Sequence, residues 1–230
     1  MNLPKLSPRL KKIAELVEKC DVFLDVGTDH AYLPVYLINS GICKTAVASD
    51  LRQGPLNRAR ETARLFFAEE KVDLRLGSGF ETVCEGEADV AVVAGMGGVL
   101  IGELLENSEK IAKALKSLVL QPMTAVFELR KFLYENGYTV CEEVLVKEEE
   151  KLYHILKVLP FEEKNKKSEA ELYFGDKISK NSPFYEEYKE RQIKKLETKL
   201  FGIKKAKSKN EELKKTYEQT IILLEEIKKF

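Results

Sequence analysis

Short apolar runs recur along the first two thirds of the chain, and stretches with helical spacing separate most of them. The runs are mostly β-branched and alternate poorly, which is typical of strands that a parallel sheet covers on both faces. They lie at residues 22–26, 45–49, 72–76, 90–94, 118–121, 138–146 and 152–159. Helical spacing occurs between them, for example at residues 55–70 and 124–136. The pattern predicts a doubly wound α/β sheet with right-handed crossovers.

The last two runs break this alternation. Residues 147–151 alone separate them, which is fewer than the dozen or more residues that a parallel crossover needs. These two runs are therefore predicted to form an antiparallel hairpin at the end of the sheet. Five parallel strands closed by such a hairpin make a Rossmann-like outline.

The residues after Pro160 follow a different pattern, rich in Lys and Glu. Residues 184–201 and 210–230 each carry apolar positions at 3-4 spacing, and 202–210 can supply a turn. An antiparallel coiled-coil hairpin is predicted, with Ser182 as the cap of its first helix and Pro183 at the first helical position. The predicted seam consists of Ile193, Leu196, Leu200, Ile203, Leu213, Tyr217, Leu224 and Ile227.

The chain has 230 residues, more than the roughly 150 of an average domain. We expect one full domain at residues 1–160 and a helical tail at 161–230. Hydrophobic residues make up 44% and charged residues 33%, as in a folded, water-facing protein. No window approaches the ~20 apolar residues of a membrane span, and the N-terminus does not resemble a secretory signal. A cytoplasmic location without membrane association is expected.

The formal net charge of zero conceals an asymmetry. Residues 161–230 carry 18 Lys and Arg against 14 Asp and Glu, which leaves 20 against 24 for residues 1–160. A basic tail on an acidic body suits a polyanionic partner, and a solvated helical face is the alternative.

The cysteines and histidines indicate no metal site. Four cysteines lie far apart without a Cys-x-x-Cys motif, and the chain has two histidines, His30 and His154. Neither a zinc site nor a disulfide framework is predicted. We interpret His154 as a structural residue and expect buried or inert thiols at Cys20, Cys43, Cys84 and Cys141.

A glycine turn follows the first predicted strand, at Gly27. Ligands of open α/β sheets bind at this edge, and a glycine lets the backbone approach a ligand closely. A dinucleotide site would need glycines where Asp29 and Tyr32 stand. A carboxylate at Asp29 repels a pyrophosphate, whereas Asp25 or Asp29 attracts the ammonium group of a methionine moiety. The turn favours S-adenosylmethionine (SAM) over NAD, with an ordinary tight loop as the alternative.

Four further strand ends are acidic, polar or glycine-rich. Asp50 ends the second strand, where a carboxylate can accept hydrogen bonds from ribose hydroxyls. The small residues 77–79 leave room for an adenine ring, and the backbone at 95–98 can lie against the cofactor. The predicted cofactor-binding residues are Asp25, Gly27, Asp29, His30, Asp50, Leu51, Gln53, Gly77, Ser78, Gly79, Gly95, Met96 and Gly97.

Four motifs together carry a family resemblance: Leu-Ser-Pro-Arg-Leu at 6–10, Asp-Val-Gly-Thr-Asp-His-Ala-Tyr-Leu-Pro at 25–34, Gly-Met-Gly-Gly at 95–98 and Leu-Gln-Pro at 120–122. With them the chain resembles the bacterial tRNA (adenine-N1)-methyltransferases that modify adenine 22 in the D-loop region. The resemblance covers residues 1 to about 160 closely and the helical tail in kind. It implies a class I methyltransferase sheet with a C-terminal coiled coil, SAM as cofactor, tRNA as partner and no metal.

Two positions depart from the family pattern. Ser78 stands where the family commonly has Asp, and Met123 where it commonly has Asn. Ser78 can still hydrogen-bond adenine, but Met123 lacks the donor and acceptor of an amide. Only Gln121 and Pro122 are therefore carried over as residues near the target base.

Methylation of adenine at N1 makes modest chemical demands. The ring nitrogen already owns an in-plane lone pair, so the transfer needs alignment and desolvation more than a strong base. The product carries positive charge, which a nearby carboxylate can stabilise. Asp29 and His30 are the catalytic candidates; helix capping by Asp29 and packing of His30 at a helix start are the alternatives.

A target adenine inside folded tRNA must be unstacked while phosphate contacts hold the RNA. The predicted substrate-binding residues are Lys5, Arg9, Tyr32, Arg52, Gln121 and Pro122, with further phosphate contacts at Lys11, Lys12, Lys204, Lys205, Lys207 and Lys209. Two rival interpretations stay open: a SAM-dependent methyltransferase of another RNA, a small molecule or a protein, and a non-catalytic RNA-binding module. The sequence leaves the oligomeric state open, with a monomer as one expectation.

Overall fold

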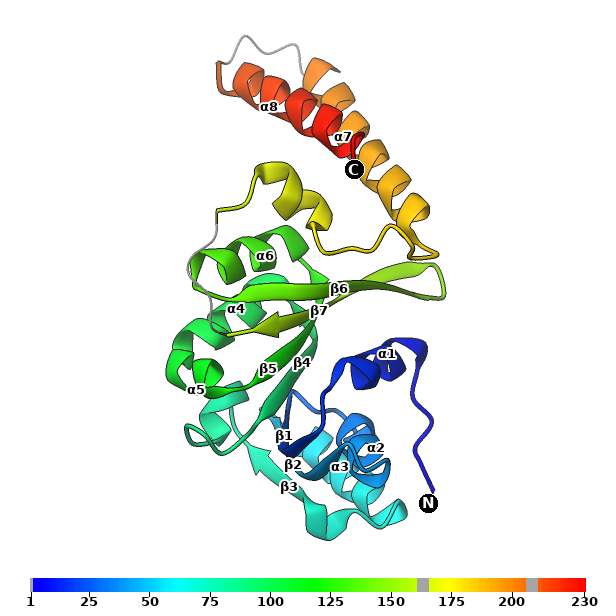
Figure 1. The fold of residues 1–230 in the computed structure, drawn as a ribbon, viewed down its shortest axis with the longest axis vertical. Coiled ribbons are helices and arrows are strands. Elements are labelled where there is room, and N and C mark those ends of the chain that lie inside the picture. The colour runs from blue at the N-terminus through cyan, green and yellow to red at the C-terminus, as the bar shows by residue number, and fades with distance from the viewer. Residues whose placement is uncertain (1, 161–165, 206–210) are drawn as a thin grey trace.

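Seven strands form one mixed sheet in the order β3-β2-β1-β4-β5-β7-β6 (Figure 1). The computed structural model describes residues 2–160, 166–205 and 211–230. The five parallel strands are β1 (Cys20–Val26), β2 (Cys43–Asp50), β3 (Val72–Leu76), β4 (Val90–Gly97) and β5 (Ser117–Thr124). The antiparallel hairpin consists of β6 (Thr139–Glu148) and β7 (Lys151–Leu159). The predicted Rossmann-like sheet and its closing hairpin are confirmed.

Helices cover both faces of the sheet. They are α1 (Pro8–Leu16), α2 (Tyr32–Asn39), α3 (Gln53–Leu65), α4 (Gly98–Asn107), α5 (Glu109–Ala114) and α6 (Val126–Glu135). Residues of α1, α2 and α3 share one buried cluster with Phe23, whereas residues of α4, α5 and α6 share another with Leu24. Adjacent side chains of β1 thus enter opposite cores, which is why its sequence is continuously apolar.

The predicted helix at 55–70 is too long, because α3 ends at Leu65. Phe67 adopts a left-handed backbone conformation with φ of +57°, and its amide donates to the Arg64 carbonyl oxygen at 3.1 Å. The amide of Ala68 donates to the Ala63 carbonyl oxygen at 2.8 Å. These bonds satisfy carbonyls at the end of α3 and turn the chain toward β3.

The tail consists of α7 (Tyr185–Lys205) and α8 (Glu211–Ile227), which lie beyond the β6–β7 edge of the sheet (Figure 1). Helix α7 begins at Tyr185, two residues after the predicted first helical position, Pro183. Ser182 Oγ accepts a hydrogen bond from the Phe184 amide at 3.4 Å, but Pro183 precedes α7 instead of opening it. The turn expected from residue 202 is also misplaced, since α7 continues through Gly202 to Lys205; residues 206–210 lie outside the described part.

A third buried cluster joins the two tail helices to the hairpin. Leu196, Leu224 and Ile227 of the predicted seam are buried in it, and Ile193 and Leu200 pack against it. The same cluster contains Leu145 of β6, so the tail packs on the sheet domain as well as on itself. Ile203 and Tyr217 are half-buried, and the side chain of Leu213 lies outside the described part.

Two of the four predicted buried or inert thiols are buried, and two are exposed. Cys20 and Cys43 are register partners on β1 and β2 and both are buried. Burial raises the pKa of the Cys20 thiol to about 11 and that of Cys43 to about 12. Cys84 and Cys141 are exposed; Cys84 lies in a loop and Cys141 in the edge strand β6.

None of the described helices is both long and apolar enough to cross a bilayer. Within the same residues, no three or more His, Cys, Asp or Glu side chains come together as a metal site.

Candidate cofactor and active site

A cavity of about 320 Å³ opens where the carboxyl ends of β1 and β4 meet. Strand β1 pairs with β2 on one side and β4 on the other, so this edge is the topological switch point at which open α/β sheets bind ligands. Seven predicted site residues line the cavity: Arg9, Asp25, Gly27, Asp29, His30, Tyr32 and Gly95.

The β1–α2 turn requires Gly27 for two reasons. Its φ is +77°, and a Cβ atom at this position would lie 2.2 Å from the Met96 methyl group. The amides of Gly27 and Thr28 donate to the Ser49 carbonyl oxygen at 2.9 and 2.8 Å. Thr28 Oγ1 accepts from the Ala31 amide at 3.1 Å. The turn is therefore fixed by Thr28, and the interpretation of Asp29 as the helix cap is wrong.

Asp25 places a buried carboxyl group in the cavity wall. Burial raises its pKa from 3.8 to about 6, and the hydrogen bond from Thr28 offsets part of that rise. No Lys or Arg within the described residues forms an ion pair with it. A buried carboxylate without a cation is a favourable partner for a ligand ammonium group.

Asp29 and His30 lie at the mouth of the same cavity. The Asp29 carboxylate is paired with the Arg58 guanidinium of α3, which holds the pKa of Asp29 below its usual value. His30 Nε2 lies 3.3 Å from Asp29 Oδ2, and its ring stacks on Tyr32 with centroids 5.3 Å apart. Sequence reasoning missed Arg58; its place in the second turn of a helix beside the glycine turn was the available signal.

Asp50, at the end of β2, is turned toward its own loop. Its Oδ1 accepts from the Arg52 amide at 2.8 Å, and the Arg52 Nε lies 3.7 Å from the same oxygen. Leu51 and Arg52 are exposed, and Gln53 Nε2 donates to Asn57 at 3.0 Å. These residues lie outside the wall of the 320 Å³ cavity.

The end of β3 lies beside β2 at the same edge. The Gly77 amide donates to the Asp50 carbonyl oxygen at 3.0 Å. Ser78 precedes a short 3-10 turn, Gly79–Thr82, and Gly79 is buried with φ of +51°. A Cβ at Gly77 would lie 2.7 Å from Thr82, so this tight turn depends on small residues.

The glycine run after β4 brings two loops close together. Gly95 has φ of +78°, and Gly97 precedes α4. A Cβ at Gly98 would lie 2.2 Å from the Ala125 carbonyl oxygen, so the β5–α6 loop packs directly on this backbone. Met96 packs over Gly27, which places it beside the cavity.

Gln121 is fully buried and both ends of its amide are occupied. Its Oε1 accepts from Arg9 Nη1 and, at 3.1 Å, from the Gly95 amide. Its Nε2 donates to the Pro122 carbonyl oxygen at 2.9 Å. Gln121 therefore joins α1, β4 and β5, whereas the neighbouring Met123 is 42% exposed.

Arg9 lines the cavity instead of the outer surface. Its guanidinium lies over the Tyr153 ring, 5.3 Å from the centroid, and its buried Nε has no partner in the described structure. Sequence reasoning grouped Arg9 with Lys5 and Lys11, but those lysines are exposed and outside the cavity wall. A carboxyl group, a cationic guanidinium and glycine backbone in the wall of one cavity fit the zwitterionic end of SAM.

The remaining basic candidates are dispersed over the surface. Lys12 pairs with Glu15 at 2.9 Å, and Lys204 Nζ lies 5.6 Å from the Tyr217 ring centroid. Lys205 is exposed, and Lys207 and Lys209 lie outside the described residues. Their contacts with RNA stay predictions.

The sheet order, the switch-point cavity and the glycine-rich strand ends define a SAM-type methyltransferase. The family model for the methyltransferase domain matches residues 6–156. The tRNA (adenine(22)-N(1))-methyltransferase of Bacillus subtilis is 35% identical over 156 residues, 68% of this chain and 66% of the relative. The chain belongs to the methyltransferase family that contains the bacterial tRNA (adenine(22)-N(1))-methyltransferases.

Two solved structures extend the similarity to nearly the whole chain. A Streptococcus pneumoniae protein proposed as a tRNA (m1A22) methyltransferase has a TM-score of 0.86 and 32% identity, covering 97% of this chain and 99% of its own. M. capricolum TrmK, solved with the cofactor product S-adenosyl-homocysteine (SAH), has a TM-score of 0.81 and 27% identity, covering 97% and 96%. The helical tail is thus part of the shared fold.

Proposed function

We propose that this protein transfers the methyl group of SAM to N1 of adenine 22 in tRNA, acting in the cytoplasm as a monomer. The observation that carries the proposal is the switch-point cavity, whose wall combines the unpaired Asp25 carboxyl group with the Arg9 guanidinium. Residues 1–160 form the catalytic domain and 161–230 the helical tail in this proposal.

The cavity residues have distinct roles toward SAM, whose sulfonium supplies the methyl group. Asp25 binds the ammonium group of its methionine moiety, and the Arg9 guanidinium binds the carboxylate. Gly27 and Gly95 let the chain pass close to the ligand. Asp50 is the acceptor for the ribose hydroxyls, and Gly77, Ser78 and Gly79 leave room for the adenine ring. Arg9, predicted from the sequence to contact tRNA, binds the cofactor in this proposal.

The transfer forms a bond between adenine N1 and the methyl carbon while the sulfur–carbon bond breaks. Positive charge moves from the sulfur to the adenine ring, and SAH leaves uncharged at sulfur. Asp29, kept ionised by Arg58, stabilises that charge at the mouth of the cavity. The stacked rings of His30 and Tyr32 offer an aromatic surface for an unstacked base. Gln121 acts by holding Arg9 and the β4 end in place.

The experiment is methyl transfer from labelled SAM to tRNA transcripts, with the modified position mapped by reverse-transcription stops. We expect one methyl group per tRNA at adenine 22, and none in a transcript with guanosine at that position. Label on another RNA, a protein or a metabolite would favour a different methyltransferase. Binding of tRNA without SAH binding or transfer would favour the non-catalytic module.

A further inference from the structure

A second, larger cavity lies between the sheet domain and the tail. Its volume is about 900 Å³, within the range of small-molecule sites. Pro122 and Met123 at the end of β5 line it together with His154 of β7, and α7 supplies Gln192 and Lys195. The cavity therefore begins one residue after Gln121, the residue that holds Arg9 at the cofactor cavity.

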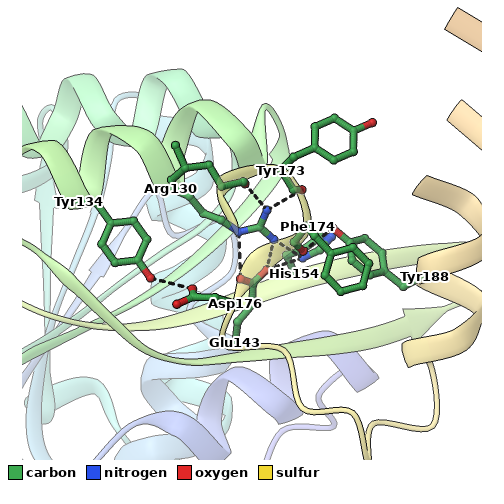
Figure 2. A network of polar contacts seen from close by, with 9 residues as sticks. Arg130, Tyr134, Glu143, His154, Tyr173, Phe174, Asp176 and Tyr188 are labelled. Carbon is green, nitrogen blue, oxygen red and sulfur yellow. Dashed lines mark hydrogen bonds and ion pairs between the residues drawn. The ribbon is translucent and has the colours of Figure 1, made fainter. Parts of the chain in front are cut away.

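His154 presents a defined hydrogen-bonding atom to this cavity. Its Nδ1 lies 2.6 Å from Glu143 Oε1, a separation that requires a proton between the two atoms. Burial lowers the pKa of His154, so the ring is neutral and Nε2 is an acceptor. The Arg130 guanidinium binds the Glu143 carboxylate and fixes its position (Figure 2). Nε2 has no partner among the described residues.

Gln192 is the second polar group without a partner. Its side chain lines the cavity, the residue is only 8% exposed, and its amide makes no hydrogen bond within the described part of the chain. Neither amide atom is among the buried unpartnered atoms of the described residues, so the amide is open to the cavity. A donor and an acceptor on Gln192, beside the acceptor on His154, match the mixed edge of a nucleobase.

The rest of the wall separates aromatic from charged groups. The rings of Phe127 and Tyr173 lie 6.5 Å apart and provide faces on which a base can stack. Lys194 and Lys195 are exposed and form no ion pair within the described residues. Arg191 is already bound to Glu187 and the Glu150 carbonyl.

The acidic residue of the wall decides the orientation of a ligand. Glu128 lines the cavity at the start of α6, where its carboxylate repels a phosphate. A phosphate is therefore accommodated on the α7 side, near Lys194 and Lys195, and the uncharged part of the ligand near Phe127 and Tyr173. This polarity suits a nucleotide better than an apolar or acidic peptide.

We propose that the cavity between α6, β7 and α7 binds a second, unmethylated nucleotide of the tRNA, with its base on His154 and Gln192 and its phosphate at Lys194 and Lys195. The proposal rests on the proposed function, because the nucleotide belongs to the same RNA. Holding a second nucleotide would fix the position of the unstacked adenine relative to the methyl group.

The test uses Gln192→Leu in the full-length protein. Leucine has a similar size, and the amide has no partner to leave unsatisfied, so we expect unchanged thermal unfolding and SAH affinity. Binding of the tRNA should weaken about 10-fold, as expected for loss of a buried hydrogen bond. Lys195→Ala should reduce the slope of the logarithm of the binding constant against the logarithm of the salt concentration by about one, the value for one lost phosphate contact. Lys199→Ala, exposed on α7 outside the cavity, is the matched control.

An abasic scan of the tRNA identifies the nucleotide. Transcripts with one base removed at a time are titrated against the wild type and Gln192→Leu. We expect one abasic position, other than adenine 22, that weakens wild-type binding but not that of Gln192→Leu, while Lys199→Ala behaves like the wild type. The inference is overturned if no such position exists or if Gln192→Leu binds and methylates normally. Failure of the wild type to methylate any tRNA would instead refute the proposed function, and the inference with it.

Discussion

The cofactor cavity and the junction with the tail use buried charge in opposite ways. At the cofactor cavity, the Asp25 carboxyl group has no cationic partner and the Arg9 Nε has no partner among the residues that the structure describes. At the junction, the Arg130 and Glu143 side chains are both nearly inaccessible and bind each other through two contacts. Unpaired buried charge destabilises a free protein and favours ligand binding, whereas paired charge fixes one arrangement of elements.

The junction network is complete apart from the histidine edge that faces the second cavity. Arg130 Nη1 donates to the carbonyl oxygens of Leu172 and Tyr173 at 2.8 and 3.0 Å (Figure 2). Gly175 lies against the same guanidinium; its Cβ would be 2.7 Å from Nη2. The Arg130 charge helps hold the pKa of Glu143 at about 2. The network thus ties α6, β6 and the chain leading to α7 together.

The largest expected effect is on the junction. Arg130→Met leaves Glu143 buried without its cation, and the free energy of unfolding should fall by about 3–5 kcal/mol. Urea unfolding followed by circular dichroism measures it. The double variant Arg130→Met/Glu143→Leu should recover most of the loss, because neither charge remains. Equal instability of the two variants would mean that shape, not charge, holds the junction.

The cofactor cavity should respond in the opposite direction. Asp25→Asn removes a carboxyl group whose pKa rises from 3.8 to about 6 on folding, a difference that corresponds to roughly 3 kcal/mol. The free-energy cost of burying the ionised Asp25 carboxylate is fully present above pH 6. It falls as the pH drops through 6 toward 4 and is absent below that range. The variant should therefore be more stable than the wild type at pH 8 and nearly equal at pH 4, as measured by thermal unfolding. Lower stability at pH 8 would contradict this account.

Asp29→Ala tests the chemical step at the mouth of the cavity. Loss of the carboxylate should lower kcat for tRNA at least about 100-fold, the range for removing one group that stabilises transition-state charge. SAH affinity should change much less, since Asp29 is exposed and paired with Arg58. Single-turnover methylation and calorimetry measure the two quantities, and an unchanged rate would remove Asp29 from the mechanism.

The smallest expected effect distinguishes binding of the amino-acid end of the cofactor from binding of its nucleoside end. Arg9→Ala should weaken SAH binding about 10-fold or more, as for the loss of a charge-assisted hydrogen bond. Binding of 5′-methylthioadenosine, which lacks the amino-acid part, should not change. Lys11→Ala, on the exposed side of α1, should bind both ligands normally. Equal losses for both ligands would indicate that Arg9 only supports the fold.

Local patterns predicted the architecture but not the side-chain partners. The run at residues 22–26 lies within β1, where residues 23–26 are buried, because apolar runs reflect burial directly. The pairing of Asp29 with Arg58, and the inward position of Arg9, depend on how separate helices pack around the β1 turn. The Arg130–Glu143–His154 network joins three elements, and no spacing in the sequence encodes it. The prediction that His154 is structural is correct for its Nδ1 atom, which binds Glu143. The residue also lines a cavity that the sequence does not reveal.

The most direct test of the central claim is calorimetric titration of the protein with SAH across pH. We predict one site per chain, with affinity that weakens as the pH falls through about 6, because protonated Asp25 no longer attracts the ligand ammonium group. Asp25→Asn should bind weakly at every pH and lose this dependence. An absence of binding heat, or equal and pH-independent affinity in the wild type and Asp25→Asn, would contradict the account.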